Sequence, residues 1–354
     1  MSLKFGIVKE LNNTSDHRAV FSPVLLQQLL SLYPQAKFKV ESSATRIFAD
    51  EEYSANGIEV GTDISDCDVF IGINPIPANQ LIPNKTYLFY LDLEKNQLEN
   101  EKYRQLALEK KGTIYNYSLV IDANSLQRTR GLVGAYNAFR AFGHKFELFK
   151  LPSVTTFLDQ SSLIAYLKRP VLPPLKITVV GMGEIVSGVK VIMKAMKIKE
   201  VTANDFLSKN YAQPIFTLID NLDSKDLESL TKVSDIIIAD ASINGKPVTL
   251  SQELLNAKDC KLRVVADLHP DSSNSLACTL RQSTAEEPFY GYLPSENKEV
   301  EVFHPAAVVV VAVSNLGTEF PKEAIDDFGT QLMEQVIPAF FDQDTNEILK
   351  KMQL

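Results

Sequence analysis

Hydrophobic and polar positions alternate with two different periods along the first 130 residues. Short β-branched and aromatic runs predict strands at 4–9, 38–41, 69–73, 87–89 and 113–115. Between them, residues 23–33 and 96–111 carry the apolar spacing and the Leu, Glu, Lys and Ala content typical of helices. Strands that alternate with helices predict an α/β fold with a mostly parallel sheet covered by helices.

The second half of the chain repeats this alternation. The spacing of Leu132, Tyr136, Phe139 and Phe142 predicts a long helix over 131–149 that joins two domains, and the proline-rich stretch 151–174 leads into the second. Strands are predicted at 177–180, 200–203, 236–239, 263–266 and 308–314. The stretch 321–354 is predicted to be helical, with acidic residues early and lysines late, as the helix dipole favours. A length of 354 residues suits two domains.

Composition and charge exclude several classes of partner. The net charge of −8, with no basic run longer than a pair, argues against nucleic acid and anionic membrane surfaces. No apolar stretch approaches the roughly 20 residues that span a bilayer, and the start lacks the apolar core of a signal peptide. The three scattered cysteines fit a reducing compartment, so we expect a cytoplasmic protein. His and Cys positions show no metal-ligand spacing, which predicts no metal.

A glycine turn follows the strand predicted at 177–180. Residues 181–188 read G-M-G-E-I-V-S-G, so Gly181 makes the turn, Gly183 lets the backbone approach a pyrophosphate, and Gly188 packs the following helix onto the sheet. Glu184 and Ile185, in the same turn, are also expected to bind the cofactor. Asp205, predicted to end the next strand, would accept hydrogen bonds from the adenine ribose and disfavour a 2′-phosphate. The pattern indicates NAD rather than NADP; the alternative is a structural turn with a helix-capping aspartate.

Several segments, in order along nearly the whole chain, resemble one superfamily. They read G-I-V-K-E at 6–10, R-A-V-F-S-P at 18–23, K-T-Y-L-F-Y at 85–90, G-T-I-Y at 112–115, S-T-A-E-E-P-F-Y-G-Y at 283–292 and P-K-E-A at 321–324. Together they resemble the alanine dehydrogenase superfamily, and within it lysine-forming saccharopine dehydrogenase and lysine-ketoglutarate reductase.

This resemblance implies two Rossmann-like domains with the active cleft between them. The first domain would comprise 1–130, completed by a returning C-terminal helix in 316–354, and 131–315 would bind the dinucleotide. The implied reaction moves hydride between nicotinamide and the amino-bearing carbon of a small amino-acid or oxo-acid substrate. We expect a monomer or a small homo-oligomer.

The resemblance also assigns roles to individual residues. Arg18 matches the arginine that binds a substrate carboxylate, and Arg128 or Arg130 would supply a second cation. Asp267 and His269 fall in the loop that approaches the cofactor. His17 beside Arg18 is a weaker candidate for the cleft, and His144 is expected to be structural.

Three positions depart from the catalytic members of the superfamily. Asn74 stands where they have a lysine, Asp92 where they have a histidine, and Ser314 where they have an acidic residue. Asparagine exchanges no proton near neutral pH, and aspartate needs a raised pKa to act as histidine does. Two hypotheses follow: an oxidoreductase of the saccharopine dehydrogenase type in which Asp92 carries the proton, or a descendant that binds a dinucleotide or metabolite without turnover.

Overall fold

Two compact units make up the chain in the computed structural model. The structure describes residues 3–10, 17–91, 97–157, 159–220, 224–240, 242–243, 246–248, 250–270, 276–314, 319–341, 344 and 346–354. The first unit comprises Met1–Ala123 and Pro321–Leu354, and the second comprises Asn124–Phe320. The sequence predicts the boundaries at 130/131 and 315/316, whereas the structure has them at 123/124 and 320/321. The first turns of the long helix therefore belong to the second unit.

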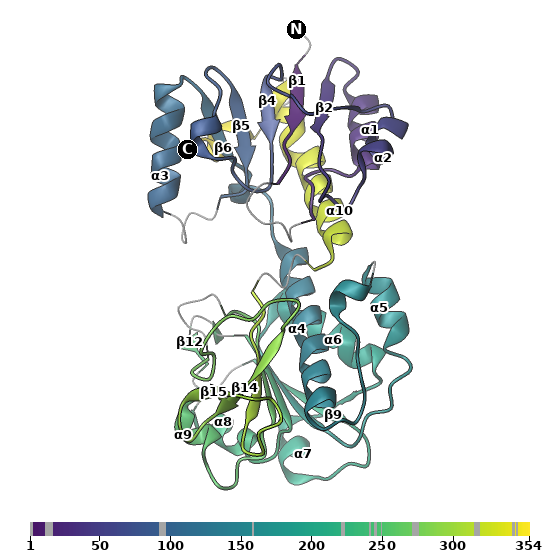
Figure 1. Ribbon diagram of the computed structural model, residues 1–354, viewed down its shortest axis with the longest axis vertical. Helices are drawn as coiled ribbons and strands as arrows, with labels where there is room; N and C mark the ends of the chain where they lie inside the picture. The colour runs from purple at the N-terminus through teal and green to yellow at the C-terminus, as the bar shows by residue number, and fades with distance from the viewer. Residues whose placement is uncertain are drawn as a thin grey trace. The chain divides into compact units, whose positions relative to one another are not determined.

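A parallel sheet of six strands forms the centre of the first unit, in the order β3-β2-β1-β4-β5-β6 (Figure 1). Its strands are β1 (Lys4–Ile7), β2 (Lys37–Glu41), β3 (Glu59–Gly61), β4 (Val69–Ile71), β5 (Thr86–Phe89) and β6 (Thr113–Asn116). The central strands are apolar at successive positions because helices cover both faces of a parallel sheet.

The helices of this unit come from both ends of the chain. They are α1 (Pro23–Leu32), α2 (Asp50–Ala55), α3 (Gln97–Glu109), α10 (Pro321–Gln331) and α11 (Ile348–Met352), with short 3₁₀ turns at Ala78–Gln80 and Tyr117–Leu119. A π-helical turn, Leu332–Val336, and a 3₁₀ turn, Ile337–Phe341, extend α10. Gly329 of α10 lies so close to α1 that an added Cβ would be 2.6 Å from the side chain of Leu25. The C-terminal segment thus completes the core of the first unit.

Eight strands form the main sheet of the second unit, in the order β15-β14-β16-β13-β10-β7-β9-β8. They are β7 (Lys176–Val180), β8 (Lys199–Glu200), β9 (Ile215–Ile219), β10 (Ile236–Ala239), β13 (Val264–Asp267), β14 (Phe289–Leu293), β15 (Lys298–Val300) and β16 (Val308–Val311). The six strands from β16 to β8 run parallel, and β14 is antiparallel to both of its neighbours. Strands β11 (Ser242–Ile243) and β12 (Lys246–Pro247) form a separate hairpin.

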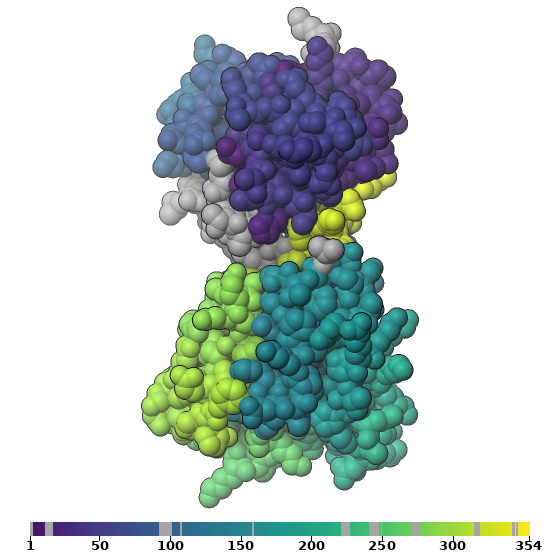
Figure 2. All heavy atoms as spheres, turned by 45° about the vertical axis from the view of Figure 1, so that its right-hand side comes forward, coloured from purple at the N-terminus to yellow at the C-terminus, as the bar shows by residue number. Residues whose placement is uncertain are grey.

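The helices of the second unit lie on both faces of this sheet. They are α4 (Asn124–Lys145), α5 (Gln160–Tyr166), α6 (Gly183–Ala195), α7 (Ala203–Ser208), α8 (Ser224–Thr231) and α9 (Gln252–Leu255), with a 3₁₀ turn at Val154–Thr156. In β10, Ile236 and Ile238 face α4 and α6, whereas Ile237 and Ala239 face the opposite core. Figure 2 shows two distant stretches meeting on the surface of this unit, the teal segment near residue 150 and the yellow-green segment near residue 300.

Most predicted elements are confirmed, and the differences are local. The long helix begins at Asn124, seven residues before its predicted start, and β16 ends at Val311 rather than at 314. The strand predicted at 200–203 is replaced by β8, which ends at Glu200, and by α7, which begins at Ala203. Thr202 caps α7 by accepting a hydrogen bond from the backbone N–H of Asp205 at 3.2 Å, which stops the strand before Ala203.

No helix within the described ranges is long and apolar enough to cross a membrane. Cys67 and Cys278 are buried, Cys260 is partly buried, and all three are free thiols.

Candidate functional site

The glycine turn lies between the carboxyl end of β7 and the N-terminus of α6, and its open backbone and the helix N-terminus together favour binding of an anion. Gly181 has φ +147° and Gly183 has φ +66°, both in the range that suits glycine. A Cβ on Gly183 would meet no atom within 4 Å, so the backbone there is open to a bound molecule. Helix α6 starts at Gly183, and its N-cap residue Met182 offers no side-chain hydrogen bond. The first N–H groups of α6 therefore have the partial positive charge that binds phosphate.

Gly188 packs against a helix and not against the sheet, so that part of the sequence prediction is wrong. A Cβ on Gly188 would lie 1.8 Å from the carbonyl oxygen of Arg128 in α4. Reciprocally, a Cβ on Gly131 of α4 would lie 1.8 Å from the carbonyl oxygen of Ile185 in α6. The two glycines let α4 and α6 touch backbone to backbone beside the first turns of α6. The side chain of Ile185 is buried in the core, while Glu184 is half-buried in the first turn.

Asp205 does not end the strand beside the glycine turn, and that prediction is also wrong. It lies in α7, where its carboxylate pairs with Lys209 at 2.8 Å. The strand that pairs with β7 on this side is β9, whose Ile219 lies opposite Val180 and accepts a hydrogen bond from the N–H of Gly181 at 3.0 Å. Asp220 directly follows Ile219 and is exposed. An acidic residue at this place, after the strand next to the glycine turn, is typical of NAD-binding sites.

The sequence interpretation missed Asp220 because it expected an acidic residue about 20 residues after the turn. Two signals were present. Thr202-Ala-Asn-Asp205 has the spacing of a helix-capping box, and Ile215-Phe-Thr-Leu-Ile219 is an apolar strand-like run that ends in an aspartate. The insertion of α7 between β8 and β9 doubles the separation in sequence without moving the acidic residue from the edge of the sheet.

His269 reaches the glycine turn through Asp240. Asp240 follows β10, and its N–H donates to the carbonyl of Val180 at 2.8 Å. A Cβ added to Gly181 would lie 3.1 Å from the Cβ of Asp240. Nδ1 of His269, in the loop after β13, lies 2.7 Å from Oδ1 of Asp240. Both side chains are partly exposed, 24% for His269 and 16% for Asp240. A carboxylate that accepts from Nδ1 leaves Nε2 to act as a hydrogen-bond acceptor.

Asp267 organises the loop that carries His269. Its buried carboxylate accepts hydrogen bonds from the N–H groups of His269 (2.9 Å) and Leu276 (3.1 Å) and from the hydroxyl of Thr279 (2.7 Å). Burial raises the pKa of Asp267, and these three donors oppose the shift. All of these partners are internal to the loop, so the contacts of Asp267 support a positioning role.

Arg128 and Arg130 lie in the first turns of α4 and belong to the second unit. Arg128 is exposed, and its carbonyl faces Gly188. Nη1 of Arg130 donates to the carbonyl of Leu268 at 3.4 Å, which ties α4 to the loop after β13. Both arginines are therefore placed beside the elements that form the glycine turn.

A second polar cluster lies at the carboxyl edge of the parallel sheet in the first unit. Glu10 follows β1, and its carboxylate accepts from the backbone N–H groups of Ile73 (2.8 Å) and Asn74 (3.0 Å) and from the side-chain amide of Asn74 (2.8 Å). Sequence reasoning quoted Glu10 as part of a motif and gave it no role. The Glu10 carboxylate is thus bound by both the backbone and the side chain of Asn74.

Tyr117 joins this cluster to Arg18. The Tyr117 hydroxyl donates to the carbonyl of Gly72 at 2.9 Å, and its ring lies 5.8 Å from that of Tyr90. Burial raises the pKa of Tyr117 well above its usual value, the Glu10 carboxylate adds to the rise, and the Arg18 guanidinium opposes it. Glu10, Arg18 and Tyr117 are therefore within electrostatic reach of one another, and Arg18 is half-buried.

Asp92 falls outside the described residues, whereas the residue before it is firmly held. The N–H of Leu91 donates to the side-chain oxygen of Asn116 at 2.9 Å, and the Asn116 amide returns a bond to the Leu91 carbonyl at 3.0 Å. Of the other candidates, His17 is exposed, with Nδ1 2.5 Å from the carbonyl of Thr45, and Ser314 is half-buried. The part of the chain that the structure describes contains no group of three or more His, Cys, Asp or Glu side chains arranged to hold a metal.

Part of the chain matches a known domain family, and most of it resembles known proteins. Residues 6–134 match the family of the alanine dehydrogenase/PNT N-terminal domain. The chain is 22% identical to alpha-aminoadipic semialdehyde synthase of Arabidopsis thaliana, over 92% of this chain and 37% of that protein. It is 20% identical to the mitochondrial alpha-aminoadipic semialdehyde synthase of Bos taurus, over 92% and 42%. The chain therefore spans only about two-fifths of the length of these two relatives.

Other similar proteins match over most of both chains. The NAD(+), L-lysine-forming saccharopine dehydrogenase of Candida glabrata is 24% identical, over 90% of this chain and 87% of that one. Among solved structures, an L-alanine dehydrogenase superposes with a TM-score of 0.65 at 16% identity, over 99% and 94% of the chains. A transhydrogenase from Sinorhizobium meliloti gives 0.59 at 17% identity, over 99% and 96%. The family match is confined to residues 6–134, and the two solved structures support the two-domain α/β fold.

Proposed function

We propose that this chain binds a nicotinamide dinucleotide at the glycine turn of its second unit. The observation that carries the proposal is the pairing of an open turn at Gly181 and Gly183 with Asp220 after the adjacent strand. The pyrophosphate would lie against the uncapped N-terminus of α6, and Asp220 would accept hydrogen bonds from the adenine ribose hydroxyls. A carboxylate at that place repels a 2′-phosphate, so the proposal favours NAD over NADP.

The reaction that we propose is oxidoreduction at the C–N bond of an amino-acid substrate, as in saccharopine dehydrogenase. When bound, the nicotinamide ring accepts or returns the hydride. In support, the chain is similar over most of its length to a saccharopine dehydrogenase and to alpha-aminoadipic semialdehyde synthases. Residues 6–134 match the N-terminal domain of the alanine dehydrogenase/PNT family. Arg18 would bind a substrate carboxylate through its guanidinium, with Arg128 or Arg130 as a second cation, and Asp92 would carry the proton.

One contact favours a second candidate function, a protein that binds the dinucleotide without turnover. The side-chain amide of Asn74, at the position where catalytic relatives have a lysine, donates to Glu10 at 2.8 Å. An amide neither supplies a proton near pH 7 nor attracts a substrate carboxylate by charge. This candidate keeps the cofactor site of the second unit and loses the acid–base group of the first.

A turnover assay separates the two candidates. The full chain with NADH is supplied with lysine plus 2-oxoglutarate, and with NAD and saccharopine in the reverse direction, while absorbance of NADH is followed. The oxidoreductase predicts turnover that falls by about 100-fold or more in an Asp92→Asn variant, the usual effect of removing a general acid or base. Glu94→Gln is the control, because it removes a neighbouring carboxylate from the same segment.

Saturable NADH binding with no turnover of either substrate pair would reject the saccharopine reaction and leave the binding candidate. Unchanged turnover in Asp92→Asn would remove Asp92 as the proton carrier.

A further inference from the structure

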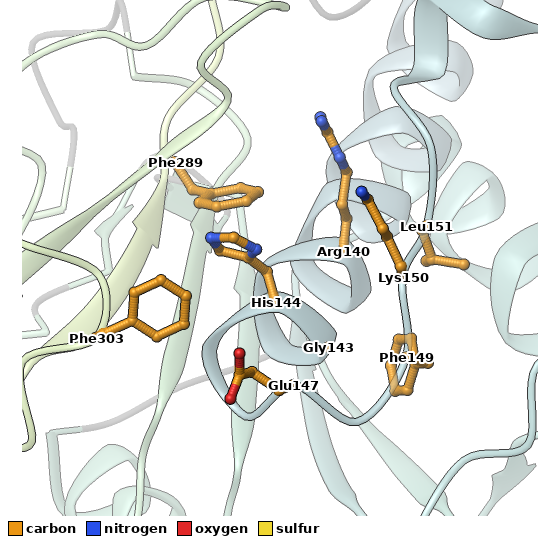
Figure 3. A pocket seen from close by; sticks show the side chains of 9 residues that line it. All are labelled: Arg140, Gly143, His144, Glu147, Phe149, Lys150, Leu151, Phe289 and Phe303. Atoms are coloured by element: carbon orange, nitrogen blue, oxygen red, sulfur yellow. The ribbon is translucent and has the colours of Figure 1, made fainter.

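A cavity in the second unit, apart from the glycine turn, combines aromatic rings with cationic side chains. Its volume is about 490 Å³, which falls in the range of small-molecule sites. It lies between the C-terminal end of α4, the segment that follows α4, and β14 with the loop after β15 (Figure 3). Its lining comprises Arg140, Gly143, His144, Glu147, Phe149, Lys150, Leu151, Phe289 and Phe303.

This cavity shares no lining residue with the glycine turn. Arg140 lies eight residues beyond Leu132, which corresponds to about 12 Å along the axis of α4 at 1.5 Å per residue. Leu132 marks the level at which α4 touches Gly188 of α6. A molecule bound in the cavity would therefore occupy a place of its own along α4.

Arg140 is the most unusual group in the cavity. Its Nη1 is buried and has no hydrogen-bond partner among the described residues. The guanidinium makes no ion pair within those residues and lies over the ring of Phe289 at 5.8 Å from the ring centre. Burial lowers the pKa of Arg140, and the group that opposes this shift is Tyr136. Arg140 as a whole is half-buried. A cation that is partly withdrawn from water and has no carboxylate partner loses hydration that no opposite charge offsets.

The groups around Arg140 indicate which kind of ligand would compensate for its lost hydration. Lys150 also lines the cavity, and its side chain points in the same direction as that of Arg140 in Figure 3. The carboxylate of Glu147 points away from both cations in that view. A carboxylate can accept two parallel N–H bonds from a guanidinium and also supplies the opposite charge. A neutral amide or hydroxyl does not supply that charge.

The rest of the cavity wall is apolar and aromatic. The ring of His144 lies 5.6 Å from that of Phe289 and 5.0 Å from that of Phe303, and Phe303 is 55% exposed. Phe149 and Leu151 add further apolar surface. Flat aromatic walls favour a ligand with an apolar or aromatic body.

A neighbouring hollow shows where an anion would not bind. It has a volume of about 600 Å³ and shares Arg140, His144 and Phe289 with the first. Its additional arginine, Arg281, is already paired with Glu299 through two bonds of 2.8 Å, and Glu286, Glu287 and Glu301 also line it. These carboxylates repel an anion, so the charge of a ligand must be met at Arg140 and Lys150.

We propose that the cavity between α4, β14 and the loop after β15 binds a small carboxylate with an apolar body, its carboxylate on Arg140 and its body against Phe289 and Phe303. Lys150 adds charge at the same end of the ligand. This site goes beyond the proposed oxidoreductase function and does not depend on it.

The absence of tryptophan from the sequence gives a clean test. A Phe303→Trp variant carries a single indole at an exposed edge of the cavity, and its fluorescence reports occupancy. The probes are benzoate, octanoate and 4-phenylbutyrate, each compared with its neutral amide, and phenethylamine serves as a cation of similar size. Saturation by at least one carboxylate at or below about 1 mM, with at least tenfold weaker binding of its amide, is expected for a ligand held by a charge-assisted pair.

Variants at Arg140 locate the charge. In the Phe303→Trp background, Arg140→Gln is expected to weaken carboxylate binding by about tenfold or more, and Arg140→Lys by less, since it keeps the charge and loses the two-point geometry. Arg169→Gln, an exposed arginine near α5, is the control and should leave binding unchanged. Unaltered circular dichroism shows that a loss does not come from unfolding; if Arg140→Gln does not fold, Lys150→Gln and Arg140→Lys carry the comparison.

Several results would overturn the proposal. The proposal fails if no carboxylate gives a saturable fluorescence change, if a carboxylate and its amide bind equally, or if phenethylamine binds more tightly. It also fails if carboxylate binding stays unchanged when both Arg140 and Lys150 are substituted. A concentration-dependent dimer of the unaltered chain that Phe303→Ala disperses would show that the aromatic face is covered by a second copy instead. Dinucleotide binding is measured in parallel, and its failure would leave this result unaffected.

Discussion

At the scale of single residues, two aspartates of the second unit lie in different environments, and only one of them is proposed to bind the adenine ribose. Asp220 is exposed after β9, beside the glycine turn, whereas Asp205 is paired with Lys209 in α7. Asp220→Asn should weaken NAD binding by about tenfold, through the loss of charged hydrogen bonds to the ribose, and should reduce the discrimination against NADP. Asp205→Asn should change neither. Calorimetric titration of both variants with NAD and NADP measures this, and a loss confined to Asp205→Asn would restore the interpretation made from sequence alone.

The three cysteines allow a prediction on reactivity. Burial raises the pKa of the Cys67 thiol to about 11 and that of Cys278 to about 12, while Cys260 is only partly buried. Since the thiolate is the reactive form, a thiol of pKa 11 is ionised to roughly one part in a thousand at pH 8. In the native protein at pH 8, Cys260 should react with a disulfide reagent first, and Cys67 and Cys278 only after unfolding in guanidinium. Three equally fast thiols in the native state would contradict the burial of Cys67 and Cys278.

At the scale of elements, the contact between α4 and α6 depends on glycine. A Cβ on Gly188 would overlap the carbonyl of Arg128, whereas a Cβ on Gly183 meets open space and suffers only from φ +66°. Gly188→Ala should therefore destabilise the protein by about 1–3 kcal/mol or more through overpacking, and Gly183→Ala by about 1 kcal/mol through backbone strain. Thermal unfolding compares the two variants. Equal stability would show that α4 and α6 separate at little cost.

Helices and strands with a strong periodic pattern could be predicted from sequence, whereas the strands beside which they lie in the sheet could not. The runs around Val69, Ile177 and Ile236 were recognised because strands buried on both faces are continuously apolar. The strand β9 has the same apolar character but was not predicted. Its position beside β7 follows from the sheet and not from its distance along the chain. The glycine turn was found from its own residues. Asp220 and Asp240 were identified only from the strand ends of the second unit's sheet, and Glu10 only from those of the first unit's sheet.

At the scale of the whole molecule, the chain leaves the first unit at Ala123 and returns at Pro321. Phe328 of α10 is 3% exposed and lies 5.7 Å from the ring of Tyr90, while Phe206 of α7 is buried in the second unit. Phe328→Ala and Phe206→Ala should each cost about 3–5 kcal/mol. Hydrogen exchange should then show lost protection in β1, β4 and β5 for the first variant and in β7 and β9 for the second. Equal loss of protection in both units from either variant would show that they unfold as one.

The central claim is that a nicotinamide dinucleotide binds at the glycine turn of the second unit, and a titration with NADH tests it most directly. NADH fluorescence is followed as the full chain is added, for the unaltered protein and for Gly183→Val, whose side chain would fill the open space over the turn. We predict saturable enhancement with the unaltered chain and binding at least tenfold weaker with a folded Gly183→Val. The absence of saturable binding to the unaltered chain, or equal binding by both proteins, would contradict the claim.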